Sequence, residues 1–240
     1  ALATSYANNR FPMIPFYIFY SMFGFQRIHD LAWAAGDSRA RGFLLGATSG
    51  RTTLNGEGLQ HQDGHSHILA STIPNCRSYD PAFSYEISTI IQEGIKDMYV
   101  QGNDRFYYLT LMNENYQHPK RPKNATSKNI INGAYKFLEA KNPSIRILAS
   151  GVTLNFAIQA EKLLSKMNVI AEIWSITSFT ELYKGAIESD RNNRLEINNS
   201  PSHVEECFSN EMTTIAVSEY IRSYPNQIRQ WVKGDYIVLG

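Results

Sequence analysis

Hydrophobic positions along the first half of the chain alternate between strand-like runs and helix-like periods. Runs rich in aromatic and β-branched residues predict strands at 15–20, 42–47, 76–79 and 105–112. Apolar side chains recur every three to four positions over 21–40 and 85–99, which predicts helices there. The run at 15–20 is apolar at almost every position, so we expect a buried strand.

The pattern restarts after a polar, proline-broken stretch at 118–124, which is the best candidate for a domain boundary. A strand at 145–149, a helix at 153–167 and a strand at 169–176 then form a βαβ unit. Such units build parallel sheets. We expect this helix to bury one apolar face, made of Phe156, Ala160, Leu163 and Met167.

Two further strands, at 212–217 and 236–239, flank a predicted helix near 221–232. Strands and helices therefore alternate on both sides of the boundary. This predicts an α/β protein with two three-layer αβα domains, at residues 1–124 and 125–240.

Composition narrows the class of protein. The chain has 240 residues, 43% hydrophobic and 19% charged, with a formal net charge of +1. We expect a globular chain with no broad electrostatic attraction to nucleic acid or to a membrane surface. The two cysteines, Cys76 and Cys207, have no metal-site spacing, which favours a reducing compartment such as the cytoplasm. Both ends interrupt the pattern, so we expect a piece of a larger protein.

Candidate chemistry is concentrated in residues 51–67, where His61, His65 and His67 stand close together around Asp63. Glycines break this segment, which suits a loop that presents polar groups to a ligand. His61 and His65 have the spacing of a zinc-protease motif, but glutamine stands where such a motif needs its glutamate base. Two other interpretations remain open: the histidines hold the loop together, or one of them acts as an acid, a base or a hydrogen-bond donor.

Several segments together resemble one enzyme family. Asp63-Gly64-His65-Ser66-His67 is similar to the D-G-x-[ST]-H stretch of transketolase-like thiamine diphosphate enzymes. The wider likeness is to the homodimeric bacterial type of pyruvate dehydrogenase, the decarboxylating first component of its complex. It rests on runs in both halves of the chain: 9–22, 23–28, 37–46, 51–67, 73–75, 112–116, 177–182 and 235–240.

The resemblance implies a fold and an activity. It implies a pyrimidine-binding domain that lacks its N-terminal part, followed by most of a transketolase C-terminal-like domain. It also implies that thiamine diphosphate and Mg²⁺ are held largely by a domain absent from the chain, at the interface of a homodimer. The family decarboxylates pyruvate and acetylates the lipoyl group of an acyltransferase component. The isolated chain should therefore be inactive, and the alternative is a non-catalytic interaction module that retains the fold.

The resemblance also assigns roles to a few residues. Tyr20 and Phe23 match aromatics that lie against the aminopyrimidine, whereas the residues alone, without the resemblance, favour core packing for both. Arg27 lies one helical turn beyond Phe23 and either reaches the same site or forms a surface ion pair.

The resemblance makes His61 the active-site histidine, with Glu57 as a possible support and no metal ligand in the chain. Two residues depart from the family pattern. His29 replaces an expected glycine on a helix that should lie near the cofactor. Gln62 replaces an expected glutamate and removes a charge beside His61.

Overall fold

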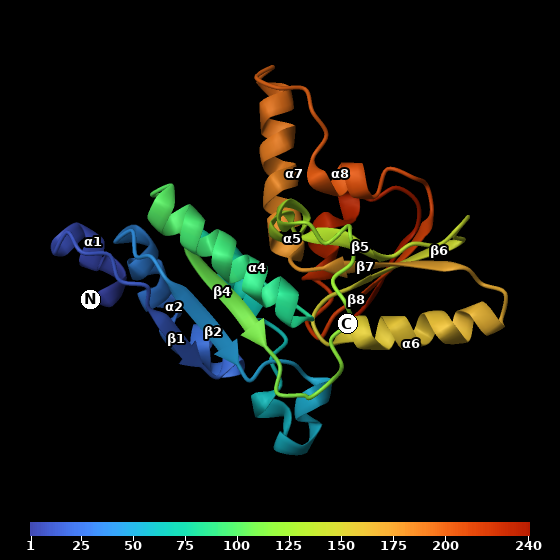
Figure 1. Cartoon of the computed structure of the whole chain (residues 1–240), viewed down its shortest axis with the longest axis horizontal. Coiled ribbons are helices and arrows are strands. Elements are labelled where there is room, and N and C mark those ends of the chain that lie inside the picture. Colours follow the sequence, from blue (N-terminus) through green and yellow to red (C-terminus); the bar gives the residue numbers. More distant parts are fainter. The chain divides into compact units, whose positions relative to one another are not determined.

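A computed structural model describes all residues, 1–240, and divides them into two units, Ala1–His118 and Pro119–Gly240. Each unit has its own sheet with helices on both faces (Figure 1). No helix in either unit is both long and apolar enough to cross a membrane.

The sheet of the first unit has four parallel strands in the order β1-β2-β4-β3. The strands are β1 (Phe16–Phe19), β2 (Phe43–Ala47), β3 (Cys76–Tyr79) and β4 (Phe106–Leu111). The helical segments are η1 (Leu2–Thr4), α1 (Ser5–Asn8), α2 (Ser21–Asp37), η2 (Thr52–Glu57), η3 (Leu59–His61), α3 (Ser66–Ser71), α4 (Ser84–Ile95) and η4 (Lys96–Val100). The strands and the two long helices predicted for this half are thus confirmed, with ends shifted by a few residues.

Burial of the first strand is where the sequence prediction was wrong. Phe16, Tyr17 and Ile18 are 46%, 56% and 64% exposed. The reason is position in the sheet, because β1 is an edge strand that pairs only with β2. Strands inside the sheet, such as β4, are buried on both faces as the prediction assumed for β1.

The second unit has a five-stranded sheet in the order β5-β7-β6-β8-β9, in which only β5 runs antiparallel to its neighbour. The strands are β5 (Ala134–Leu138), β6 (Ile145–Ala149), β7 (Ala171–Ile176), β8 (Thr213–Val217) and β9 (Tyr236–Leu239). The helical segments are α5 (Ser127–Asn132), α6 (Thr153–Lys166), α7 (Phe179–Arg194), α8 (His203–Cys207) and η5 (Pro225–Trp231). Helix α6 lies on one side of the sheet and α7 on the other (Figure 1).

The predicted βαβ unit is confirmed, since β6 and β7 pair in parallel across α6. The predicted face of α6 is wrong. Phe156, Leu163 and Met167 are exposed, whereas Leu154 and Ala157 are buried against the sheet. Both faces of this helix carry apolar residues, so periodicity alone did not identify the buried one.

Several elements of the second unit were not predicted, among them the polar helix α7. Ser178 caps α7, because its hydroxyl oxygen accepts a hydrogen bond of 2.9 Å from the backbone N–H of Glu181. The helix predicted near 221–232 is a shorter 3₁₀ segment, η5.

A buried ion pair crosses the centre of the second sheet. Nε of Arg146 on β6 donates to a carboxylate oxygen of Glu172 on β7 at 2.9 Å, and both side chains are almost fully buried. Nζ of Lys136 reaches the other oxygen of Glu172 at 2.9 Å, and Nε1 of Trp174 donates to the first. These hydrogen bonds and charges hold the pKa of Glu172 below its usual value despite burial, which opposes them.

Candidate active site

The carboxyl ends of strands β1, β2 and β4 meet at one edge of the first sheet, where open α/β sheets place their ligand sites. Two hydroxyl groups tie these ends together. The hydroxyl of Ser21, after β1, donates to the carbonyl of Thr48, after β2, at 3.0 Å. The hydroxyl of Ser49 donates to the carbonyl of Leu111 on β4 at 3.1 Å. The edge is therefore a fixed platform for the side chains beside it.

Three rings gather beside this platform. The centroids of the Tyr20 and Phe23 rings are 5.3 Å apart. The imidazole of His61 lies 5.4 Å from each of them and meets both edge-on. All three side chains are partly exposed, so the cluster presents an aromatic surface that is open to a ligand. The structure thus brings together two segments about forty residues apart, the start of α2 and the histidine loop.

A backbone hydrogen bond fixes the orientation of His61. Its Nδ1 lies 2.9 Å from the carbonyl oxygen of Glu57. A carbonyl can only accept, so Nδ1 carries the proton and Nε2 of the neutral ring is an acceptor. Nε2 can donate a hydrogen bond only after the ring gains a second proton.

The side chain of Glu57 makes a second link, to Tyr20. The Tyr20 hydroxyl donates to Oε2 of Glu57 at 2.9 Å. Partial burial and this bond to a carboxylate raise the pKa of Tyr20, so the phenol stays protonated as the donor. Glu57 therefore contacts the histidine through its backbone and the aromatic pair through its carboxylate.

Arg27 lies on the outer side of the same cluster. Its guanidinium carbon is 4.4 Å from the centroid of the Phe23 ring, the geometry of a cation–π contact. The side chain is exposed, and no ion pair to it is found, although one had been an alternative.

The other two histidines of the loop have different surroundings. His67 is fully buried, and its Nε2 is 3.0 Å from the Thr110 hydroxyl, which itself donates to Asp80 at 2.7 Å. Burial lowers the pKa of His67 to about 3, so this ring is neutral. His65 is exposed. Of the two interpretations left open by the sequence, the buried and hydrogen-bonded ring of His67 favours the structural one, in which a histidine holds the loop together.

The side chain of Asp63 binds backbone N–H groups at the start of α3, the helix that carries His67. Its Oδ1 accepts hydrogen bonds of 3.0 Å from the backbone N–H groups of His65 and Ser66, where α3 starts. The loop thus ends in a packed helix, which the glycine-rich sequence did not suggest. In residues 1–240, no group of three or more histidine, cysteine or carboxylate side chains is arranged so that it could hold a metal ion. Zinc therefore has no ligand set in this loop.

The two departures from the family pattern lie at different distances from the ring cluster. Nε2 of His29 is 3.2 Å from the hydroxyl of Thr72, at the end of α3, so His29 joins α2 to α3. It takes no part in the contacts among the three rings. Gln62 directly follows His61 and donates to Oδ1 of Asn55 at 3.4 Å, within the loop.

Sequence reasoning missed the residues that build the platform. Ser21 and Ser49 act on carbonyls far along the chain, and a single serine in a sequence gives no signal for such a contact. The segment at 112–116 carries part of the family likeness and follows the end of β4, where its Tyr116 packs against Phe83 and donates to the carbonyl of Ala82.

Comparison with known proteins identifies the family. The model of the pyruvate dehydrogenase E1 component middle domain matches residues 1–119, and that of the transketolase-like C-terminal domain matches residues 133–240. The pyruvate dehydrogenase E1 component of Pseudomonas aeruginosa is 53% identical over the whole chain, and that of Escherichia coli is 47% identical. The chain belongs to the pyruvate dehydrogenase E1 family. It spans 28% of the length of these E1 relatives.

Solved structures show the same architecture. Transketolase from Campylobacter jejuni superposes with a TM-score of 0.70 at 17% identity, covering 95% of this chain and 31% of that one. A split-gene transketolase described as an inactive β4 tetramer has a TM-score of 0.62 at 14% identity, covering 99% of this chain and 69% of that one. The predicted transketolase-like fold is thereby confirmed for this E1 family member.

Proposed function

We propose that this chain is part of a thiamine diphosphate-dependent pyruvate dehydrogenase, which decarboxylates pyruvate and acetylates a lipoyl group. The observation that carries the proposal is the cluster of Tyr20, Phe23 and His61, held together by Glu57 at the carboxyl edge of the sheet. Identity of about half to E1 components over the whole chain supports the same assignment.

The residues present fit one end of the cofactor. Tyr20 and Phe23 offer partly exposed rings on which a flat aminopyrimidine can pack, and Arg27 borders them. Thiamine diphosphate, when bound, supplies a carbanion and accepts the electrons released by decarboxylation. The chain has no cluster of acidic or metal-ligating side chains for Mg²⁺. We therefore assign Mg²⁺ and the diphosphate to another domain of the longer protein.

His61 is the residue we assign to proton transfer. With Nδ1–H bound to the Glu57 carbonyl, Nε2 is directed to other partners as an acceptor in the neutral ring. Protonated, it can donate to the carboxylate or keto oxygen of pyruvate, and neutral, it can take a proton back. Glu57 is a positioning residue in this scheme, because it acts through His61 and Tyr20.

The same assignment implies partners. We propose a homodimer in which another subunit completes the cofactor site, and a lipoyl-bearing acyltransferase component as the acceptor of the acetyl group. Pyruvate is the proposed substrate, and the cytoplasm is the proposed location.

Activity of matched proteins tests this proposal. The 240-residue chain alone should release no carbon dioxide from pyruvate with thiamine diphosphate and Mg²⁺, because we assign the diphosphate to another domain of the longer protein. The longer polypeptide of the source organism should do so. Decarboxylation by the chain alone would contradict the division of the site. An inactive longer polypeptide that still dimerises would favour the non-catalytic interaction module.

A further inference from the structure

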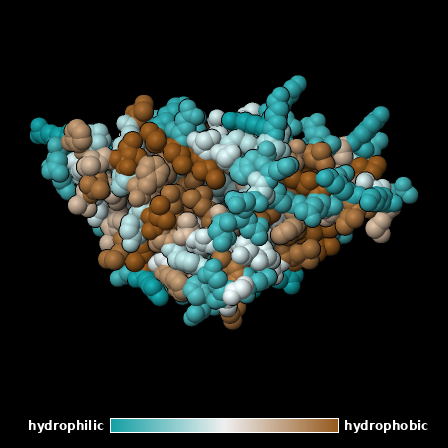
Figure 2. Space-filling view, turned by 60° about the horizontal axis from the view of Figure 1, so that its bottom comes forward, coloured by the Kyte–Doolittle hydropathy of each residue, from teal (hydrophilic) through white to brown (hydrophobic).

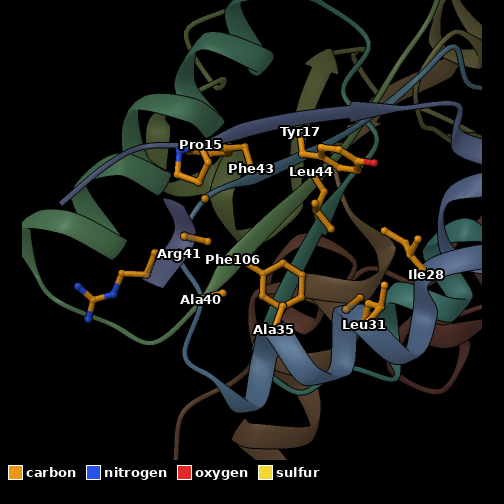
Figure 3. Close-up of a pocket in the computed structure, with 13 residues that line it drawn as sticks. Pro15, Tyr17, Ile28, Leu31, Ala35, Ala40, Arg41, Phe43, Leu44 and Phe106 are labelled. Carbon is orange, nitrogen blue, oxygen red and sulfur yellow. The ribbon is translucent and has the colours of Figure 1, made fainter. Parts of the chain in front are cut away.

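The apolar surface and the apolar cavity of the first unit carry little reactive chemistry. Figure 2 shows a broad hydrophobic area over this unit, on the left of the view. A cavity of about 180 Å³ lies between β1, β2 and α2, and its one charged lining residue, Arg41, points its guanidinium away (Figure 3). Exposed polar side chains gather instead in the loop after β2, which is drawn in teal at the bottom of Figure 1.

The chain contains two Asn-Gly dipeptides, Asn55-Gly56 in this loop and Asn132-Gly133 at the end of α5. Asparagine before glycine is prone to deamidation, because glycine has no side chain to hinder its own nitrogen and allows wide backbone rotation. The glycine nitrogen bonds to Cγ of the asparagine, the bond from Cγ to Nδ2 breaks, and the glycine amide proton leaves with Nδ2 as ammonia. Water then opens the imide ring to aspartate or isoaspartate, so water is the only co-reactant.

The structure leaves Asn55-Gly56 open to this reaction. All six residues from 55 to 60 are exposed, and Leu54 is the only buried residue of η2. Leu54 also interrupts the helix, since its φ of −119° and ψ of 15° are not helical. The Asn55 side chain makes one long hydrogen bond, in which Oδ1 accepts from Nε2 of Gln62 at 3.4 Å. Short 3₁₀ segments with few buried contacts open at low cost, so the backbone can reach the reactive geometry.

Asn132-Gly133 is the same dipeptide in a setting that blocks the reaction. Gly133 is buried, has a φ of 104°, and ends α5 as its left-handed cap. Its N–H donates to the carbonyl of Ile130 at 3.3 Å, and its carbonyl accepts from the N–H of Ser178 at 3.2 Å. The glycine nitrogen can approach the Asn132 side chain only if the end of α5 unfolds. The two dipeptides therefore form a matched pair within one chain.

The consequence of deamidation at Asn55 falls on Glu57, which directly follows Gly56. The carbonyl oxygen of Glu57 lies 2.9 Å from Nδ1 of His61, and its carboxylate accepts from the Tyr20 hydroxyl at 2.9 Å. Isoaspartate carries the main chain through the former side chain, which adds one methylene to the backbone before Gly56. Such an insertion shifts the residues beside it, and misplacement of a catalytic group by about 1 Å can cost about 10²-fold in rate.

We propose that Asn55 is a site of spontaneous deamidation, and that isoaspartate at this position releases Glu57 from His61 and Tyr20. The first part rests on chemistry and exposure alone. The second part rests on the proposed function for its effect on turnover, since the contacts of Glu57 matter to catalysis only in the active enzyme.

Peptide mass spectrometry of the longer polypeptide of the source organism tests the first part. Incubation without cofactor in mildly alkaline buffer should convert the Asn55 amide to a carboxyl group, with isoaspartate identified by protein isoaspartate methyltransferase. Asn132 should react at least about tenfold more slowly, because its glycine is held in a helix cap. Gly56→Ala should suppress the reaction at Asn55 and leave Asn132 unchanged. The added methyl group meets no atom within 4 Å in this chain, and Gly56 has no positive φ.

Turnover of the aged and fresh protein, measured after cofactor is added, tests the second part. The rate should fall in proportion to isoaspartate at Asn55, toward a loss of about 10²-fold in fully modified protein. Repair by the methyltransferase with S-adenosylmethionine should restore part of the rate, and Gly56→Ala should keep its rate through the incubation. Amide hydrogen exchange at residues 57–62 needs no activity, and it should become about tenfold faster in the aged protein.

The first part fails if Asn55 stays intact through the incubation or if Asn132 reacts as fast. The second part fails if isoaspartate at Asn55 leaves exchange at residues 57–62 unchanged, or if Gly56→Ala loses turnover as fast as the unchanged protein. A longer polypeptide that never decarboxylates pyruvate would remove the proposed function, while the mass and exchange measurements would still decide this inference.

Discussion

Nδ1 of His61 donates a 2.9 Å hydrogen bond to the backbone carbonyl of Glu57, and this bond determines what the histidine can do. It fixes the tautomer and directs Nε2 toward other partners. The Glu57 carboxylate meanwhile holds the Tyr20 hydroxyl at 2.9 Å. One loop residue therefore couples the histidine proposed for proton transfer to the aromatic surface proposed for the cofactor.

Replacement of His61 tests its proposed role. In the active longer enzyme, His61→Ala should lower kcat by about 10²-fold or more, the scale of a lost proton donor or acceptor. His65→Ala is the matched control, since His65 is exposed in the same loop, and it should keep near-normal turnover. Steady-state decarboxylation rates of both variants provide the measurement. A His61 variant as active as the His65 variant would leave His61 with a purely structural role.

Coupling between Tyr20 and Glu57 can be measured by a double-mutant cycle. Tyr20→Phe and Glu57→Gln each weaken the same hydrogen bond, so the two effects on unfolding free energy should not add. The coupling should be below about 1 kcal/mol, because the bond is exposed. Tyr6→Phe is the control partner, since its hydroxyl binds the Arg39 carbonyl elsewhere, and it should add with Glu57→Gln. Strict additivity for Tyr20 would show that the bond is not formed in solution.

His67 should make the first unit sensitive to acid. Its folded pKa, about 3, lies below the usual 6.5, so the unfolded state binds the proton first as pH falls. Above pH 6.5 the ring is neutral in both the folded and the unfolded state, so it does not reduce stability. Between pH 6.5 and about pH 3 the unfolded state gains a proton that the folded state does not bind, and stability falls progressively. The slope should approach about 1.4 kcal/mol per pH unit from this group.

Urea unfolding of the first unit at pH 7, 6 and 5 checks this dependence. His67→Gln should flatten it over that range, whereas His65→Gln, at an exposed histidine, should not. An unchanged slope in His67→Gln would assign the acid sensitivity to other groups.

Removal of one partner of the buried Arg146–Glu172 ion pair should cost more unfolding free energy than removal of both partners. Glu172→Leu should destabilise the unit by about 3–5 kcal/mol, because it leaves the buried guanidinium of Arg146 without its carboxylate. The double variant Arg146→Met with Glu172→Leu should recover much of that loss. Glu93→Gln, which breaks the exposed pair with Lys96, should cost below about 1 kcal/mol. Denaturant unfolding of the unchanged chain and the three variants gives these free energies. A double variant that is less stable than Glu172→Leu would contradict the prediction.

The sequence by itself determined the periodic part of the architecture. Strand β4 and the β6-α6-β7 unit follow from local hydrophobic runs, because buried strands and packed helices need those runs in their own residues. The family likeness in 51–67 also singled out His61, because a motif of consecutive residues can be recognised without knowledge of tertiary contacts. The polar helix α7 and the antiparallel strand β5 were not predicted, because neither has a strong hydrophobic periodicity in its own sequence.

Only the tertiary structure decided which side chains of each strand and helix are buried and which are exposed. The apolar run of β1 is exposed because it lies at a sheet edge, and α6 buries Leu154 in place of Leu163 because the sheet lies on that side. Tyr20 and Glu57 are 37 positions apart, yet their hydrogen bond forms because β1 and the loop after β2 end at one edge. Burial of a side chain and pairing of a strand depend on how segments distant in the sequence pack together, and a local sequence pattern carries no information about that packing.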